Sequence, residues 1–452
     1  MQEAILQPQI ISVAQLLKKP ALQIPPYQRP YKWQNRQVNQ LLDDLFLHKK
    51  KSAYRLGTLV FHQDSKARLN IVDGQQRTLT LLLIALAIFS NEGPLSEVLT
   101  KAKIKPITSN WFQDLKFSSS TSQKNLQANY RLIKRRVAEF DPELVRFFYE
   151  KCQLVEVVLS DITEAFQFFD SQNSRGRDLA PHDLLKAFHL REMEDTSNEK
   201  ERGITVKNWE KQDSQHLQAV FSQYLYRIRN WSRGQSARFF TKDDVHLFKG
   251  LSPNRKKPFP YAKPFKIAHF YVEEYNGSAV RQVDEQQMAY PFQIDQVVIN
   301  GKRFFEMIEH YSKVIAQLKQ SESSIETPQN IFQILNTYPE RNRTGDTYVR
   351  NLFDCAVLHY WDKFGEMDLV RAVELLFVWA YSLRLKLTNV QLASIDNYAY
   401  KEGPKMFQLI RDAQTPAEVF RIRLSPLFKN EVKRNELKKV LSVFKALNYY
   451  YE

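Results

Sequence analysis

Residues 71–84 read Ile-Val-Asp-Gly-Gln-Gln-Arg-Thr-Leu-Thr-Leu-Leu-Leu-Ile, and this stretch decides the fold of the N-terminal part of the chain. The apolar residues before Gly74 predict a strand, and those after Arg77 predict a helix, with a tight turn between them. A glycine lets the backbone approach a ligand closely, the amides of a helix N-terminus favour anions, and arginine offers a fork of donors suited to phosphate. We therefore expect an anion, and a nucleotide phosphate in particular, to bind at this turn.

A structural interpretation of the same turn also exists, in which Asp73 caps the helix while Gln75 and Gln76 are solvated. A second stretch, residues 24–33, weighs against it and reads Ile-Pro-Pro-Tyr-Gln-Arg-Pro-Tyr-Lys-Trp. Its three prolines exclude a helix or a central strand, so we expect an extended edge or loop. Its side chains suit stacking on a base or sugar beside a phosphate-binding cation, although a hydrophobic clasp under a loop is the alternative. The candidate ligand-binding residues here are Tyr27, Arg29, Tyr31 and Trp33.

Three ordered motifs carry a family resemblance. They are residues 24–33, residues 56–77, and residues 165–179, which read Ala-Phe-Gln-Phe-Phe-Asp-Ser-Gln-Asn-Ser-Arg-Gly-Arg-Asp-Leu. In this order they resemble the GmrSD N-terminal-domain family, also called domain of unknown function 262. The resemblance implies a ParB-like nuclease-type fold that binds, and in several members hydrolyses, nucleoside triphosphate. Members typically serve modification-dependent restriction and phage defence, and DNA cutting usually belongs to a second, His-Asn-His domain.

The same resemblance implies a set of phosphate contacts. Arg29 and Arg77 would bind and polarise the β- and γ-phosphates, while the amides of Gly74 and Gln75 offer a cradle. The third motif would form a loop near the same pocket, although a purely structural turn is equally consistent with its residues. The candidates in that loop are Asn173, Arg175 and Gly176.

Catalysis at this site would need a carboxylate and a positioned water. By the resemblance, Asp73 would orient water or a metal ion, and Gln75 or Gln76 would position the attacking water. Asp44 is the candidate second carboxylate for Mg²⁺, an ion that prefers oxygen ligands, and its alternative role is that of a solvated helix residue. The expected catalytic residues are Asp73, Gln75, Gln76 and Arg77, with nucleoside triphosphate and Mg²⁺ as cofactors.

Composition favours a cytoplasmic protein with a polyanionic partner. The 452 residues suffice for two or three cores, and 65 Lys and Arg against 50 Asp and Glu give a formal net charge of +15. Cys152 and Cys355 are far apart in apolar surroundings, which predicts reduced buried thiols. The first residues lack the features of a secretory signal, and the longest nearly apolar run, residues 79–89, is shorter than the roughly twenty residues that a bilayer requires.

Positive charge is concentrated in residues 199–266, which hold fifteen Lys and Arg against six Asp and Glu. Aromatic residues interleave with the cations in residues 224–233 and 238–240. This mixture suits neutralisation of a nucleic-acid backbone and stacking on unpaired or flipped bases. The alternative is a helix with core aromatics and a solvated basic face. The candidate DNA contacts are Arg227, Arg229, Arg233, Arg238, Arg255, Lys256 and Lys257.

The pattern of elements predicts an α+β protein. Residues 56–61 and 69–72 predict a pair of strands, residues 154–159 predict another, and helical spacing dominates from about residue 303 onward. We expect a ParB-like nucleotide-binding domain at residues 1–195. A basic, aromatic-rich connecting region at residues 196–300 and a mostly α-helical C-terminal domain at residues 301–452 would follow it.

Two absent motifs limit the function. No Gly-x-x-x-x-Gly-Lys-Ser/Thr loop occurs, and the nine histidines show no His-Asn-His nuclease pattern. We expect a nucleoside-triphosphate-hydrolysing component of a DNA restriction or anti-phage defence system, which senses modified or foreign DNA and acts with a separate nuclease subunit. A homo-oligomer of this chain is also possible on the sequence alone. The alternatives are a non-catalytic DNA-binding module switched by nucleotide, and a nuclease that nicks DNA itself through carboxylates such as Asp44 and Asp73.

Overall fold

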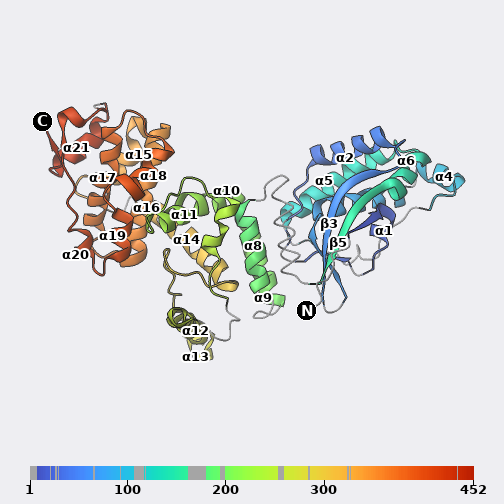
Figure 1. The fold of residues 1–452 in the computed structure, drawn as a ribbon, viewed down its shortest axis with the longest axis horizontal. Helices are drawn as coiled ribbons and strands as arrows, with labels where there is room; N and C mark the ends of the chain where they lie inside the picture. Colours follow the sequence, from blue (N-terminus) through green and yellow to red (C-terminus); the bar gives the residue numbers. More distant parts are fainter. Residues whose placement is uncertain are drawn as a thin grey trace. The chain divides into compact units, whose positions relative to one another are not determined.

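The chain has an α+β architecture in this computed structural model, as expected from the sequence. The structure describes residues 8–20, 22–25, 28, 30–64, 67–91, 93–105, 117, 119–160, 180–193, 199–252, 259–283, 286–322, 325, 327–434 and 436–452. The chain forms two compact units, one of residues 1–179 with 199–211 and one of residues 180–198 with 212–452 (Figure 1). The boundary that the sequence analysis places at residue 300 lies inside the second unit.

The first unit contains a mixed sheet of five strands. Across the sheet their order is β1 (Gln9–Ser12), β5 (Cys152–Leu159), β3 (Tyr54–Gln63), β4 (Leu69–Asp73) and β2 (Leu22–Gln23). β5 runs antiparallel to β1 and parallel to β3, while β4 runs antiparallel to β3 and parallel to β2. The strand pair expected from residues 56–61 and 69–72 is therefore confirmed as the β3–β4 hairpin.

Helices pack around this sheet. They are α1 (Val13–Leu17), α2 (Asn35–His48), α3 (Gln75–Phe89), α4 (Pro94–Lys101), α5 (Ser120–Val137), α6 (Pro142–Arg146) and the π-helical turn η2 (Phe147–Lys151). The same unit also includes α9 (Glu199–Lys211). α5 packs against both α2 and α3, and Figure 1 shows α2 and α5 side by side along the sheet. α3 buries twelve of its fifteen residues, because its sequence is apolar on every face. The start of this buried helix is where the expected anion site lies.

The second unit is almost entirely helical, as the stripes beyond residue 303 predict. Its first elements are α8 (Pro181–Glu192), α10 (Ser214–Ala219), η3 (Val220–Leu225), α11 (Tyr226–Trp231), η4 (Lys242–Phe248), η5 (Pro260–Ala262), α12 (Lys263–Gly277) and α13 (Ala279–Val283). Then follow α14 (Lys302–Ser321), α15 (Ile331–Thr337), η6 (Pro339–Asn342), α16 (Thr344–Phe364), α17 (Leu369–Lys386), α18 (Leu392–Asn397), η7 (Tyr398–Glu402), α19 (Met406–Asp412), α20 (Pro416–Val419), β6 (Leu427–Phe428), η8 (Lys429–Glu431), α21 (Lys438–Ala446) and β7 (Tyr450–Tyr451). α16 and α17 pack along each other at its centre.

Both cysteines are buried free thiols, as their apolar surroundings predict. Burial raises the pKa of the Cys152 thiol to about 12, so this sulfur is protonated at neutral pH. None of the helices in the described part of the chain combines the length and the apolar character needed to cross a bilayer.

Candidate functional site

The turn between β4 and α3 has the backbone geometry of an anion site. Gly74 caps α3 with φ of +88°, and a Cβ at this position would lie 2.3 Å from Cδ2 of Leu59. The helix begins with the bond from Thr78 N to Gly74 O at 2.9 Å, and Gly74, as its N-cap residue, has no side chain that could cap it. The first amides of such a helix have no acceptor within the helix and favour an anion, while the capping role considered for Asp73 stays an alternative.

Arg77 lies over a second glycine. A Cβ on Gly57 would meet Nη1 of Arg77 at 2.7 Å, and Gly57 itself has φ of +116°. Gly57 follows a bulge in β3, where the register against β5 shifts between Arg55 and Gly57. Burial lowers the pKa of Arg77, while the charge of Asp73 raises it. A cation that has lost much of its water and keeps a carboxylate nearby is well suited to a charge-assisted bond with phosphate.

Gln76 ties the proline-rich stretch to this turn. Its Oε1 accepts hydrogen bonds from the amides of Lys32 at 2.7 Å and Trp33 at 3.2 Å. Its Nε2 donates to the carbonyl of Pro30 at 3.1 Å and to Oε1 of Gln75 at 3.4 Å. The side chain is only 6% exposed, and its amide is occupied by backbone groups. The predicted role of Gln76 in positioning the attacking water is therefore wrong, and Gln76 instead holds two segments together.

Further bonds fix the proline-rich stretch from both sides. Nε2 of Gln28 donates to the carbonyls of Ile71 at 2.8 Å and Val72 at 2.6 Å, at the end of β4. From α5, Asn129 Nδ2 donates to Trp33 O at 2.8 Å, and Asn125 Nδ2 donates to Tyr31 O at 3.0 Å. The sequence analysis did not single out the two asparagines. Their i, i+4 spacing on one helix face was the available signal.

The two described aromatic residues of this stretch, Tyr31 and Trp33, do not form an exposed stacking surface. Tyr31 is fully buried, its hydroxyl bonds to Thr80 Oγ1 at 2.8 Å and accepts from Asn129 Nδ2 at 3.1 Å, and burial raises its pKa. Trp33 is half-buried against the hydrophobic core. The prediction that Tyr31 stacks on a nucleotide is therefore wrong, because its ring is part of the core. The clasp considered as the alternative describes Tyr31 and Trp33 better.

Asp44 does not join Asp73. It lies in α2 and accepts a hydrogen bond from the Tyr54 hydroxyl at 3.1 Å, whereas Asp73 pairs with Val60. Tyr54 and Val60 are six residues apart on β3, which is roughly 20 Å at about 3.3 Å per residue. The expectation that both carboxylates bind one Mg²⁺ is thus wrong. Among the described residues no three His, Cys, Asp or Glu side chains gather as potential metal ligands, so Mg²⁺ here would be held by Asp73, phosphate oxygens and waters.

Several candidates fall outside the described residues. They are Tyr27, Arg29, Asn173, Arg175, Gly176, Arg255, Lys256 and Lys257. Their expected contacts with nucleotide or DNA stay predictions. Arg29 has two described neighbours in the sequence, Gln28 and Pro30. Gln28 is hydrogen-bonded to the end of β4, and Pro30 is hydrogen-bonded to Gln76 at the start of α3.

Two arginines of the basic segment are core residues. Arg229 is 3% exposed and donates to the carbonyls of Ile294 at 2.6 Å and Gln296 at 2.9 Å. Arg227 is 7% exposed and bonds to Asn351. Their expected contacts with DNA are therefore wrong, because α11 is buried along its whole length and the guanidinium groups serve internal acceptors.

The remaining described cations of this segment differ from each other. Arg233 is exposed, which leaves its predicted DNA contact open. Arg238 is partly exposed, and its Nε lies 3.2 Å from the buried carboxylate of Asp396. That carboxylate also accepts from Trp231 Nε1 at 2.9 Å. Arg238 thus anchors the chain after α11 to α18.

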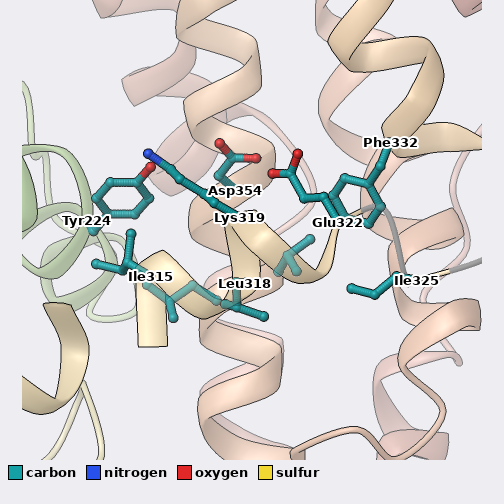
Figure 2. A pocket seen from close by; sticks show the side chains of 10 residues that line it. Tyr224, Ile315, Leu318, Lys319, Glu322, Ile325, Phe332 and Asp354 are labelled. Carbon is teal, nitrogen blue, oxygen red and sulfur yellow. The ribbon is translucent and has the colours of Figure 1, made fainter. Parts of the chain in front are cut away.

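Tyr224, one of the interleaved aromatics, lines a cleft inside the helical unit. Figure 2 shows its ring beside Lys319, whose ammonium lies 5.6 Å from the ring centroid. The carboxylates of Glu322 and Asp354 point into the same cleft, and both pair with Arg350. The two cations, Lys319 and Arg350, are equal in number to the two carboxylates. This cleft therefore adds no excess positive charge for binding nucleic acid.

A glycine turn that opens a helix, with an arginine in the first turn of that helix and a proline-rich segment bonded to it, defines a candidate phosphate-binding protein. Residues 13–190 match the model of the GmrSD restriction endonuclease, N-terminal domain, which confirms the resemblance found in the sequence. Residues 201–439 match the model named Family of unknown function (DUF7834). Since the second match covers more than half of the chain, the protein belongs to that family, and its N-terminal part carries the GmrSD N-terminal domain. No curated protein matches the chain.

Proposed function

We propose that this protein is a nucleoside-triphosphate-binding and hydrolysing component of a DNA restriction or anti-phage defence system. It would sense modified or foreign DNA and license a separate nuclease. The observation that carries the proposal is the clamp made by Gln76, which brings the proline-rich stretch to the β4–α3 turn. The match to the N-terminal domain of a restriction endonuclease supports the cellular role.

The proposed chemistry follows from the groups at the turn. The first-turn amides of α3 and the guanidinium of Arg77 would hold the β- and γ-phosphates, because both present donors to a concentrated negative charge. Asp73 would carry a Mg²⁺ that also binds phosphate oxygens. Gln75 remains the candidate for positioning water, since among the described residues only its Oε1 is engaged, by Gln76.

A second candidate function is a binding switch without hydrolysis. The engagement of Gln76 favours it, because one of the two glutamines expected to position water serves the backbone instead. In this case the triphosphate would fix the arrangement of the turn and the proline-rich stretch without being cleaved. Phosphate release by purified protein with Mg²⁺ separates the two functions.

Arg77→Ala tests the triphosphate site itself. Loss of a charge-assisted phosphate contact should weaken triphosphate binding by about 10- to 100-fold, as measured by calorimetry. Arg77→Lys should fall between this variant and the wild type, because it keeps the charge and loses the fork. Arg135→Ala is the matched control, since this exposed arginine lies on α5 in the same unit.

Three outcomes decide between the functions. Unchanged triphosphate affinity in a folded Arg77→Ala variant would remove the site from the β4–α3 turn. Binding without phosphate release would identify the switch. Nicking of modified or unmodified DNA by the protein alone, abolished by Asp73→Ala, would instead identify a nuclease, whereas we expect no nicking.

A further inference from the structure

An arginine-lined cavity lies in the second unit, far along the chain from the β4–α3 turn. It has a volume of about 780 Å³, counting the part open to solvent, and Arg343, Arg384 and Arg434 line it. The start of α16 forms one wall, and the loop after α17 forms another. An anion is the class of ligand that three arginines around one opening would bind.

The charges around this cavity do not cancel. Arg343 and Arg434 share one carboxylate, that of Glu436, with N–O distances of 3.5 Å and 2.9 Å. Arg384 pairs with Asp346, with Nε 3.0 Å from Oδ1. Among the described residues, these three arginines thus pair with two carboxylates, which leaves an excess of one positive charge. This excess matches the single charge of a phosphodiester or of a partly protonated phosphate.

The helix start adds donors to this charge. Arg343 precedes α16, a helix of 21 residues, and its side chain does not cap it. The first amides of such a helix have no acceptor within it, and the helix dipole places about half a positive charge there. A Cβ at Gly345 would lie 3.1 Å from the carbonyl of Val390, so glycine lets the loop after α17 approach the helix start closely.

A buried guanidinium lies in the cavity wall. The Arg384 side chain is 3% exposed and donates through Nη1 to Leu387 O at 3.1 Å. Its Nε is engaged by Oδ1 of Asp346, the partner in the ion pair. Arg384 is thus a cation held in the cavity wall by a carboxylate and a backbone carbonyl.

We propose that this cavity binds a phosphate group, carried by a nucleotide or by a nucleic-acid backbone. Arg343 would contact the phosphate from the rim, the α16 amides would cradle it, and Arg384 would supply charge from the wall. This site is separate from the triphosphate site of the first unit and does not depend on it. It also supplies the anion-binding surface that Arg227 and Arg229, being buried, do not form.

The test uses the full chain carrying Arg77→Ala, so that the first site contributes little. Arg343→Ala is the informative variant, because Arg343 is half-exposed and its only described side-chain contact is the one with Glu436 at 3.5 Å. Arg423→Ala is the matched control, since this arginine is also exposed in the second unit and does not line the cavity. Thermal unfolding of each variant verifies that the fold is kept.

Pyrophosphate, adenosine monophosphate and duplex DNA are the probes. We expect Arg343→Ala to weaken binding of at least one probe by about tenfold, and Arg423→Ala to change it by less than about twofold. If the phosphate comes from DNA, the slope of log affinity against log salt should fall by about one in Arg343→Ala. If it comes from a small nucleotide, the loss should appear with the first two probes and not in that slope.

Two results would overturn the proposal. One is equal binding of every probe by Arg343→Ala and Arg423→Ala, and the other is the absence of any binding by the parent protein. Neither result bears on triphosphate binding at Arg77, because that binding is measured in the chain without Arg77→Ala. The two sites can therefore fail independently.

Discussion

The β4–α3 turn and helix α11 share the prediction that their arginines contact phosphate, and they differ in structure. Both place arginine near glutamine or aromatic residues, and both were expected to bind phosphate. At the turn, Arg77 lies in the first turn of α3, and its guanidinium lies over Gly57 of β3. In α11, all six residues are buried, and Arg229 donates to internal carbonyls. The comparison teaches that an arginine beside aromatic residues in sequence can be a core residue, so that its burial and its acceptors decide whether it is available to a phosphate.

The largest effect should come from Arg229→Ala. Removing this guanidinium leaves the carbonyls of Ile294 and Gln296 without a donor in a buried place, so the free energy of unfolding should fall by about 4 kcal/mol. Chemical denaturation followed by tryptophan fluorescence measures the change. Undiminished stability together with weaker DNA binding would place Arg229 back on a functional surface and break the comparison.

A pH effect should also distinguish the second unit. Burial raises the pKa of Asp362 from 3.8 to about 7, although Ile294 N and the Tyr311 hydroxyl, both at 2.8 Å, donate to the carboxyl group and lower it. The folded state therefore holds a proton that the unfolded chain releases between pH 4 and 7. Stability should fall as pH rises through this window, by about 4 kcal/mol.

Asp362→Asn should remove this part of the pH dependence, because an amide does not titrate. Denaturation curves at several pH values for wild type and variant give the difference. Arg77 in the first unit does not contribute to this pH dependence of stability, since an arginine keeps its charge throughout this range. If the two proteins lose stability in parallel from pH 4 to 7, the proton is not held by Asp362.

A smaller effect is expected at Gly57. An alanine there must adopt φ of +116° and meets the Arg77 guanidinium at 2.7 Å, so we expect a loss of about 2 kcal/mol and weaker triphosphate binding. Gly203→Ala is the control, because this helical glycine of α9 has no atom within 4 Å of the new methyl and should gain about 0.5–1 kcal/mol. Normal triphosphate affinity in Gly57→Ala would mean that the glycine does not position Arg77.

The smallest effect on stability belongs to Arg233, the exposed cation that follows α11. Arg233→Ala should change the free energy of unfolding by less than about 0.5 kcal/mol. If this side chain contacts DNA, the salt slope of binding should fall by about one. An unchanged slope would show that the described arginines of residues 224–233 all serve the fold or the solvent.

Local patterns predicted the elements well. The β-branched and apolar run before Gly74 and the apolar run after it gave β4 and α3, because strand alternation and glycine turns are local properties. The role of Gly74 in the turn also followed from its own sequence context. The α+β class and the helical second half were found in the same way.

Contacts across long separations were not predictable. Gln76 bonds to Pro30, Lys32 and Trp33, and a single sequence does not show that these partners meet. The burial of Arg227 and Arg229 depends on acceptors at Asn351 and Ile294, which are many residues away. Aromatic residues beside arginine predicted an exposed basic face, whereas tertiary packing used the same residues as core.

The position of β5 between β1 and β3 has a consequence for synthesis. β1, at the start of the chain, pairs with β5, and β3 pairs with it in parallel over Tyr54 to His62. β5 spans Cys152–Leu159. Until these residues have been synthesised, β1 and β3 of the nascent chain each have one edge without its pairing strand. Such edges are templates for aggregation, so a chain cut between α5 and β5 should depend on a chaperone that the full chain does not need.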